Sequence, residues 1–281
     1  MINFDDLKSK VCIITGGAGV IGTAMVKALA AAGVNVVILD LKEDVAVALA
    51  KDLTNLYGNK NLGLSANVLN KESLEEAKLK ILEKFGTIDI LINGAGGNSP
   101  DATTKLEQIT QDSIENWKDG FFGLTIDGFQ KVFDLNFMGT LLPTMVFADV
   151  MVKKGAGSIV NISSMNSFKP LTKIPAYSAA KSAINNFTQW LAVHFARTGV
   201  RVNAIAPGFF LTKQNKFLLM DENTHELTER GKKIIANTPV GEFGEPEDLQ
   251  GALLFLVSDI SSFITGIVIP VDGGYSAFGG V

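Results

Sequence analysis

The chain has 281 residues, of which 47% are hydrophobic and 19% are charged. This composition excludes a disordered chain, because enough apolar surface is present to offset the entropy of ordering one sizeable core. The 25 basic and 29 acidic residues give a formal charge of −4, and no basic stripe is present, so nucleic-acid binding is disfavoured. The single cysteine, Cys12, excludes an internal disulfide framework and fits a reducing compartment.

The sequence also indicates where the protein resides. The first ten residues carry two aspartates and two lysines, unlike the charged start and apolar centre of a signal peptide. The longest apolar stretch, residues 20–41, is interrupted by Lys27, Gly33 and Asp40, so we expect a helix followed by a strand there. We therefore expect a cytoplasmic protein without a membrane partner.

Short runs rich in Val and Ile alternate with longer helical stretches along the chain. The predicted strands are 11–15, 35–40, 62–66, 88–93, 157–163, 200–206 and 267–271. The predicted helices lie near 20–32, 43–57, 71–85, 126–153, 175–198 and 246–257. Because the strands show little period-two alternation, both of their faces are expected to be buried. The pattern predicts an α/β fold in which one Rossmann-type, doubly wound parallel sheet is flanked by helices on both faces.

One domain is expected to span residues 1–281, because no linker or internal repeat divides the chain. Two longer irregular stretches lie near 96–125 and 208–246. Long loops in a compact domain are usually functional or mobile, so both stretches are lid candidates, and surface decoration is the alternative.

A glycine-rich turn follows the first predicted strand and precedes a helix. Its sequence is Thr15-Gly16-Gly17-Ala18-Gly19-Val20-Ile21-Gly22. Glycines here let the backbone approach a pyrophosphate at the helix N-terminus. Asp40 ends the second predicted strand, where a carboxylate accepts hydrogen bonds from an adenosine ribose and repels a 2′-phosphate. No arginine lies nearby and Lys42 is the nearest basic residue, so NAD is favoured over NADP.

Tyr177 and Lys181 are four residues apart on a predicted helix and share one face of it. An ammonium about 4–5 Å from a phenol, at an effective dielectric near 20, is worth roughly 3–4 kcal/mol, or up to two or three pKa units. Such a shift would bring Tyr177 into a useful range for general acid–base catalysis. Ser164 follows the predicted strand 157–163 and precedes the tyrosine by thirteen residues.

Further motifs accompany this pair. They are Asn93-Gly94-Ala95-Gly96, Asn136 in Asp-Leu-Asn-Phe-Met-Gly, Pro207-Gly208 and Pro270-Val271-Asp272-Gly273-Gly274. With them the chain resembles the short-chain dehydrogenase/reductase family over residues 11–274. The resemblance implies an NAD(P)-dependent oxidoreductase acting on CH–OH groups, with hydride transfer supplied by the cofactor.

The resemblance also implies the roles of individual residues. Tyr177 would exchange a proton with the substrate oxygen, and Ser164 would hold that oxygen by a hydrogen bond. Lys181 would hold the nicotinamide ribose and lower the pKa of Tyr177, and Asn136 would hold a water of a proton relay. The implied cofactor-binding residues are Gly16, Gly19, Val20, Ile21, Gly22, Asp40, Asn67, Val68, Asn93, Ala95, Tyr177, Lys181, Pro207, Gly208 and Thr212.

Two positions depart from the family pattern, and neither removes the cofactor prediction. Val20 stands where the family usually has glycine, so the local backbone of the loop is in question. Asn67 stands where the family often has an aspartate for the adenine, so a weaker contact is expected. No metal site is predicted, because His194 and His225 have no further ligand at metal-binding spacing.

The stretch 97–104, the Phe121-Phe122-Gly123 run and the Gly273-Gly274-Tyr275-Ser276 tail resemble the sugar-acid branch of the family. The resemblance implies interconversion of a keto sugar acid and its hydroxy acid, with D-fructuronate and D-mannonate as the pair, by a homotetramer. The polar candidates for substrate contact are Asn98, Ser99, Asn166, Lys169, Lys173, Lys213 and Lys216.

Alternatives remain open at this point. One is a carbonyl reductase for another substrate, such as 5-ketogluconate, a 3-oxoacyl thioester or a steroid-like compound. For a lipid or steroid substrate, Phe168, Phe209 and Phe210 would supply an apolar lid. The other is a non-catalytic dinucleotide-binding protein, since a fold alone does not establish chemistry.

Overall fold

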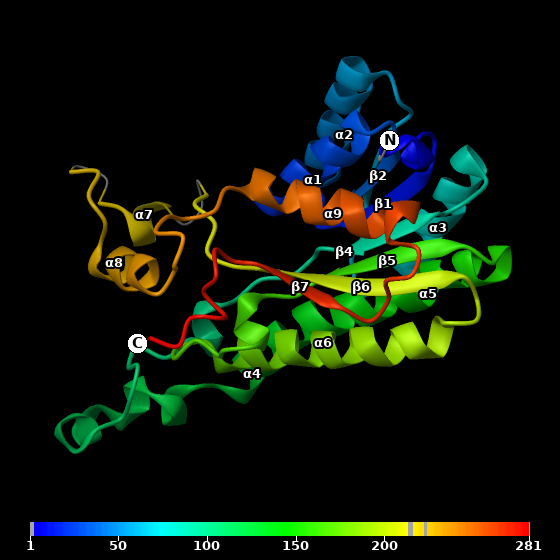
Figure 1. Cartoon of the computed structure of the whole chain (residues 1–281). Coiled ribbons are helices and arrows are strands. Elements are labelled where there is room, and N and C mark those ends of the chain that lie inside the picture. The colour runs from blue at the N-terminus through cyan, green and yellow to red at the C-terminus, as the bar shows by residue number, and fades with distance from the viewer. Residues whose placement is uncertain (1–2, 213–215, 222–223, 281) are drawn as a thin grey trace.

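Seven strands form one sheet in a computed structural model that describes residues 3–212, 216–221 and 224–280. The strands are β1 (Val11–Thr15), β2 (Asn35–Asp40), β3 (Leu62–Ser65), β4 (Ile90–Asn93), β5 (Gly157–Ile162), β6 (Val200–Pro207) and β7 (Val268–Val271). Their order is β3-β2-β1-β4-β5-β6-β7, and neighbouring strands run parallel (Figure 1). The predicted doubly wound parallel sheet is therefore confirmed, and its strand order reverses between β1 and β4.

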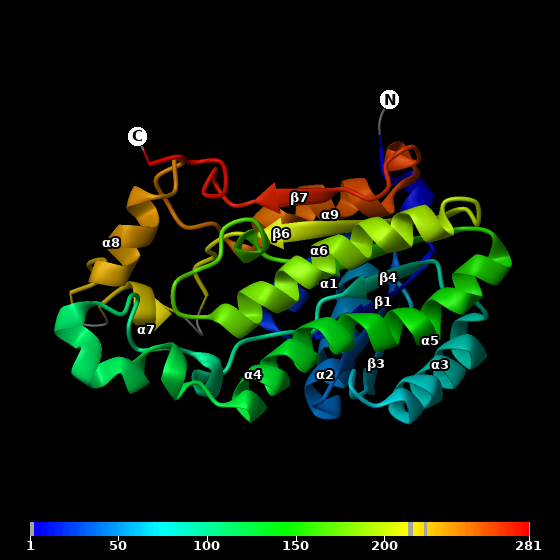
Figure 2. The same cartoon turned by 90° about the horizontal axis from the view of Figure 1, so that it is seen from below.

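Helices cover both faces of this sheet. The α-helices of the described residues are α1 (Val20–Ala31), α2 (Glu43–Tyr57), α3 (Lys71–Phe85), α4 (Ile126–Phe133), α5 (Gly139–Lys154), α6 (Pro175–Phe195), α7 (Lys216–Leu219), α8 (Glu229–Ala236) and α9 (Leu249–Val257). α1, α2 and α9 lie on one face, whereas α3, α5 and α6 lie on the other (Figures 1 and 2). This layering buries both faces of the central strands, which explains their continuous apolar runs.

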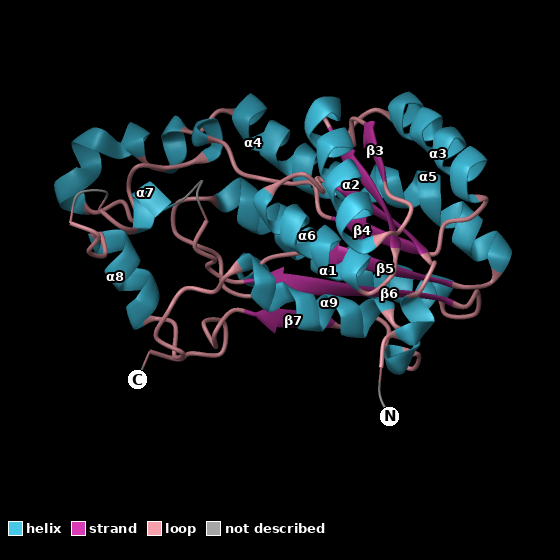
Figure 3. Ribbon diagram, turned by 90° about the horizontal axis from the view of Figure 1, so that it is seen from above, coloured by secondary structure: helices cyan, strands magenta, loops and turns pink. Residues whose placement is uncertain are grey.

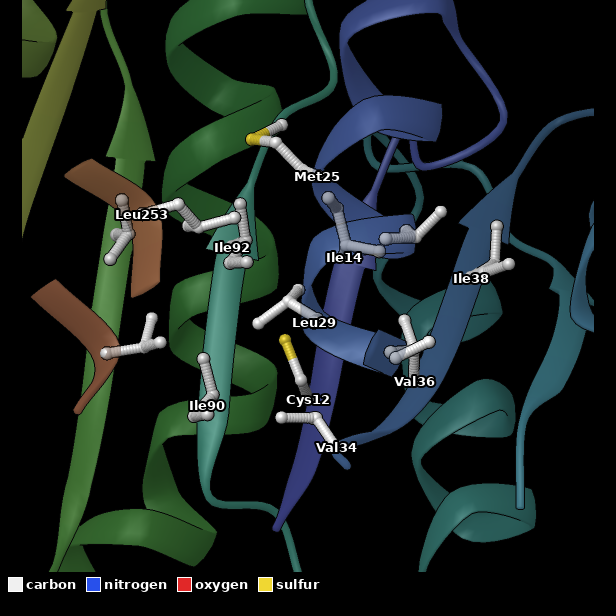
Figure 4. Packing of buried hydrophobic residues seen from close by; sticks show 14 of the residues in the cluster. Cys12, Ile14, Met25, Leu29, Val34, Val36, Ile38, Ile90, Ile92 and Leu253 are labelled. Atoms are coloured by element: carbon white, nitrogen blue, oxygen red, sulfur yellow. The ribbon is translucent and has the colours of Figure 1, made fainter. Parts of the chain in front are cut away.

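Side chains along β1 alternate between two halves of the core. Cys12 and Ile14 point into the cluster that includes Met25 and Leu29 of α1 and Leu253 of α9 (Figure 4). The intervening residues of β1 belong to the opposite cluster, under α3, α5 and α6. The thiol of Cys12 is fully buried, and burial raises its pKa well above the ordinary value. The sole cysteine is thus a packed core residue.

The helix predicted over 126–153 consists of three parts. α4 and α5 are joined by a π-helical turn at residues 134–138 that contains Asn136. Asn136 Nδ2 donates to the carbonyls of Val132 and Gly97, both at 2.7 Å. The turn therefore brings a polar side chain out of the helix to a loop that follows β4, a common role of π-helical turns near functional sites.

The span Ile126–Lys154 is long and apolar enough to cross a membrane by composition alone, because an 18-residue window within it has a mean hydropathy of 1.5. Half of that window is buried inside the fold, and Phe147 and Met151 of α5 are completely covered by the core. The span therefore serves as core structure between the sheet and its neighbouring helices.

The two predicted irregular stretches contain short helices. We call residues 96–125 the first lobe and the described residues of 208–246 the second lobe. The first lobe has 3₁₀ turns at 100–102, 111–119 and 121–123, and the second has α7 and α8. Both lobes stand side by side beyond the carboxyl ends of the strands (Figures 2 and 3). An ion pair between Lys233 Nζ and Glu107 Oε2, at 3.3 Å, connects them.

Candidate active site

A cleft of about 860 Å³ opens at the carboxyl ends of the strands, where the strand order reverses. Its walls come from the loops that follow β1, β2, β3, β4 and β6. Crevices at this position are the ligand sites of doubly wound sheets, and this volume suits a cofactor.

The glycine-rich loop after β1 has no room for side chains where it meets its neighbours. A Cβ on Gly22 would lie 2.3 Å from the carbonyl oxygen of Gly16, and one on Gly16 would lie 2.9 Å from Ala95 Cα. Gly16 also has a φ of 64°, in the left-handed region that favours glycine. Gly19 caps α1 and Val20 is its first residue, so the unusual valine begins the helix without disturbing the loop.

Asp40 lies at the end of β2 on the rim of the cleft. Its Oδ2 accepts a hydrogen bond of 3.2 Å from the backbone N–H of Ala18, in the glycine-rich loop. Asn67 also lines the cleft, and its Oδ1 accepts a hydrogen bond of 3.0 Å from the N–H of Leu69. The carboxylate is thus held at the cleft edge, next to the backbone turn.

Ser164, Tyr177 and Lys181 converge from β5 and α6. Ser164 follows β5 and hydrogen-bonds the Tyr177 hydroxyl. Lys181 Nζ donates to the carbonyl of Ile162 at 2.7 Å and lies 5.5 Å from the centre of the Tyr177 ring. Lys181 Nζ would also lie 3.3 Å from a Cβ on Gly96, which lines the cleft. The three predicted catalytic side chains therefore form one group beside the cleft.

Burial dominates the electrostatics of this group. It raises the pKa of Tyr177 above the ordinary value, and the hydrogen bond from Ser164 offsets only part of that rise. Burial also lowers the pKa of Lys181 to about 7. The predicted lowering of the Tyr177 pKa is therefore wrong for this structure. The same burial favours the neutral amine of Lys181, so only a fraction of the Lys181 side chains is protonated near pH 7.

Asn136 and Asn93 hold the surrounding backbone. Asn136 is fully buried, and its Oδ1 accepts from the N–H of Gly97 at 3.2 Å, so its amide fixes the loop after β4. Asn93 lies below the cleft, where its Nδ2 donates to Thr144 at 2.9 Å and Asn161 at 2.8 Å. Both asparagines thus support the site from within the fold.

Most of the predicted cofactor-binding residues line the cleft. They are Gly16, Gly19, Val20, Ile21, Gly22, Asp40, Asn67, Val68, Ala95, Gly208 and Thr212. Asn93 and Pro207 are buried at the ends of β4 and β6, and Tyr177 and Lys181 stand beside the cleft.

Several wall residues had no signal in the sequence analysis. They are Leu39, Leu41 and Ala66, whereas Gly94, Gly96 and Leu135 belong to motifs named above but were not predicted to line the cleft. Leu135 reaches the wall through the π-helical turn, which no local sequence pattern marks.

The polar candidates for substrate contact are dispersed. Asn98 lines the cleft, and Asn166 is buried two residues after Ser164. Lys169 Nζ donates to the carbonyl of Phe278, and Lys216 is exposed. Ser99 caps a 3₁₀ turn through the N–H of Asp101, and Lys173 is half-buried and accepts from Thr104 through its carbonyl. Lys213 lies outside the described residues.

The apolar candidates and the histidines are also placed. Phe209 and Phe210 line the cleft, whereas Phe168 is largely exposed. His194 stacks on Trp190 with ring centres 4.7 Å apart. Across residues 3–212, 216–221 and 224–280, no three His, Cys, Asp or Glu side chains gather as a metal-binding group.

Comparison with known proteins identifies the family. The sequence pattern of a family described as enoyl-(acyl carrier protein) reductase matches residues 16–276. The chain belongs to the short-chain dehydrogenase/reductase family. It is therefore an oxidoreductase that acts on CH–OH groups, as the resemblance implied.

Two relatives from bacteria match nearly the whole chain. An uncharacterized oxidoreductase of Haemophilus influenzae is 51% identical over 277 residues, which are 98% of this chain and 96% of the relative. The uncharacterized oxidoreductase UxuB of Bacillus subtilis is 49% identical over 280 residues, 99% of this chain and 98% of the relative.

A solved structure also matches nearly the whole chain. A crystal structure from Haemophilus influenza, provisionally described as a D-mannonate oxidoreductase with bound NAD, superposes with a TM-score of 0.91. That protein is 51% identical, and the match covers 98% of each chain.

Proposed function

We propose that this short-chain dehydrogenase/reductase uses NAD to interconvert D-fructuronate and D-mannonate. The observation that carries the proposal is the similarity in sequence and structure to the NAD-bound protein described provisionally as a D-mannonate oxidoreductase, over 98% of the chain. The likeness to the oxidoreductase UxuB, over 99% of this chain and 98% of that relative, adds a second relative of nearly the same length. We therefore expect the substrate to be a small hydroxylated acid.

The cleft residues fit a dinucleotide. The glycines of the loop have no side chains to cover the backbone at the N-terminus of α1, where a pyrophosphate binds favourably. The carboxylate of Asp40, held by Ala18, is suited to accept hydrogen bonds from the two ribose hydroxyls. The same charge would repel a 2′-phosphate, which supports NAD over NADP.

Tyr177 is the proposed acid–base group. When bound, the nicotinamide supplies the hydride that converts the ketone to the alcohol, or accepts it in the reverse direction. Because burial raises its pKa, Tyr177 is protonated at neutral pH and is ready to donate to the substrate oxygen as the ketone is reduced. Ser164, hydrogen-bonded to the same hydroxyl, would hold that oxygen in reach.

Lys181 and Asn136 would support this step. In its protonated form, Lys181 would stabilise the phenolate that Tyr177 becomes after giving up its proton. Its place beside Gly96, on the cleft wall, also suits contact with the nicotinamide ribose. Asn136 keeps the loop that carries Gly96 in place through Gly97, and the relay water remains a prediction.

We further propose a cytoplasmic homotetramer, on the basis of the family resemblance. The exposed face of α6 supports this assembly, because Trp190 is 55% exposed and Val193 79% exposed in the isolated chain. A chain-sized species in sedimentation would contradict the assembly without affecting the chemistry.

The experiment is oxidation of D-mannonate with NAD⁺, followed by identification of the product by NMR. We expect NADH to form together with D-fructuronate. D-gluconate, which differs from D-mannonate only in configuration at carbon 2, is the matched control and would give 5-keto-D-gluconate. Faster oxidation of D-gluconate would contradict the proposed substrate and favour the 5-ketogluconate alternative.

A further inference from the structure

Asn166 carries a buried amide oxygen that the fold leaves without a hydrogen-bond partner. The residue is only 4% exposed, and its buried Oδ1 has no hydrogen-bond partner in the described part of the chain. Its backbone N–H donates to Ser164 Oγ at 3.2 Å. An unsatisfied buried polar group costs about 1–3 kcal/mol, so such a group calls for an explanation.

Hydrogen bonds among its neighbours hold the turn around Asn166. Ser167 Oγ donates to the Ser164 carbonyl at 2.6 Å, and Asn185 Nδ2 donates to Ser167 Oγ at 2.7 Å. Asn185 also accepts from Ser163 Oγ at 2.5 Å. Asn185 of α6 therefore contacts the chain both before and after Asn166, at Ser163 and Ser167. These bonds hold the backbone turn that carries Asn166, and none of them involves its amide oxygen.

Asn166 is also close to the reacting atoms. It lies two residues after Ser164, whose Oγ contacts both the Asn166 N–H and the Tyr177 hydroxyl. A ligand oxygen held by Ser164 and Tyr177 therefore has its adjoining carbon atoms near this part of the chain. The unpaired amide oxygen is thus placed for substrate rather than for cofactor.

The chemistry of an amide selects among substrates. A neutral carboxamide both donates and accepts, as a hydroxyl does, whereas a carboxylate is better met by a cation. The ketone of D-fructuronate stands between two carbons that carry hydroxyls. A 3-oxoacyl thioester or a steroid ketone is flanked by carbons that carry only hydrogen, and would leave the amide oxygen unpaired.

We propose that Asn166 is a specificity-determining residue, whose amide hydrogen-bonds a hydroxyl on a carbon next to the reacting ketone. This inference rests on the proposed function, because it takes a hydroxylated keto acid as the substrate. A site built around such a bond rejects an analogue without the hydroxyl by up to about 10⁴-fold.

The first test measures thermal stability and needs no substrate. Asn166→Leu is compared with Asn203→Leu, because Asn203 is equally buried but donates to Ile264 at 3.0 Å and accepts from Ile267 at 3.1 Å. We expect N166L to raise Tm, since it removes an unpaired polar group, and N203L to lower it. A fall in Tm for N166L similar to that for N203L would overturn the inference, because it would mean that the Asn166 amide is already satisfied.

The second test compares two keto acids that differ only in their hydroxyls, D-fructuronate and 5-oxohexanoate. We expect N166L to reduce kcat/KM for D-fructuronate by about 10²- to 10³-fold and to leave that for 5-oxohexanoate within about 3-fold of wild type. Equal losses on both compounds would overturn the inference, since they would indicate a general disturbance of the site.

The two proposals fail in different ways. A wild-type enzyme that reduces 5-keto-D-gluconate and not D-fructuronate would contradict the proposed substrate. The Asn166 comparison would then use 5-keto-D-gluconate, whose ketone also has hydroxyls on both sides, and the same selective loss would support the inference. A wild-type preference for 5-oxohexanoate would overturn the inference itself.

Discussion

The carboxylate of Asp40 is expected to decide between the two nicotinamide cofactors. It is held at the cleft edge by the N–H of Ala18, at 3.2 Å, where the adenosine ribose is expected. Two unit charges about 5 Å apart interact with roughly 3 kcal/mol at an effective dielectric near 20. The phosphate carries more than one charge, whereas solvent at the half-exposed rim screens it. We therefore expect the charge of Asp40 to make NADPH binding less favourable by about 2–3 kcal/mol, which raises its Kd by roughly 30- to 150-fold.

Asp40→Asn removes this charge and keeps the shape and an oxygen for the Ala18 contact. We expect the Kd of NADPH, measured by fluorescence titration, to fall by roughly 30- to 150-fold. The Kd of NADH should rise about 10-fold, because a neutral acceptor makes weaker hydrogen bonds than a charged one.

Asp44→Asn is the matched control. Asp44 lies in the first turn of α2 and is exposed, so its substitution makes the same change in net charge away from the cleft rim. We expect it to change both affinities less than about 2-fold. An equal gain in NADPH affinity from both variants would refute the reasoning, since it would attribute cofactor choice to net charge alone.

Three further substitutions test the rest of the site. Gly22→Ala should abolish NADH binding in a titration, because its Cβ would meet the Gly16 carbonyl at 2.3 Å, whereas Gly251→Ala has open space and should bind normally. Tyr177→Phe should retain NADH binding but lose at least about 10³-fold in kcat, and unchanged turnover would exclude Tyr177 as the acid–base group. Burial lowers the pKa of Lys181 to about 7 from 10.5, so between these values the unfolded chain binds more protons and stability rises with pH. Lys181→Met should remove this rise in the free energy of unfolding, measured by urea unfolding at several pH values. A variant whose stability rises with pH as steeply as that of the wild type would contradict the lowered pKa of Lys181.

The strands were predictable from sequence because a doubly wound sheet leaves a plain local signal. Each central strand is buried on both faces, so its apolar run is continuous and bounded by loops. The cleft also followed, because the glycine-rich loop and Asp40 occupy fixed places relative to β1 and β2. In these elements, the residues that give the local sequence pattern are also the residues that line the cleft or the core.

Other features depend on contacts that no local pattern encodes. The π-helical turn at 134–138 exists where Asn136 reaches Gly97, which is 39 residues earlier in the chain. The helices of the second lobe are short, so their periodicity is weak, although Thr228 caps α8 by accepting from Gly231. The direction of the Tyr177 pKa shift depends on burial, which spacing alone does not give.

The most direct test of the account is NADH oxidation by the purified enzyme, followed by the loss of NADH absorbance, with a panel of keto acids. The panel contains D-fructuronate, D-tagaturonate and 5-keto-D-gluconate, each measured again with NADPH. We expect the highest kcat/KM for D-fructuronate with NADH, and a value at least about 30-fold lower with NADPH. Absence of turnover with all three sugar acids, or faster turnover with NADPH, would contradict it.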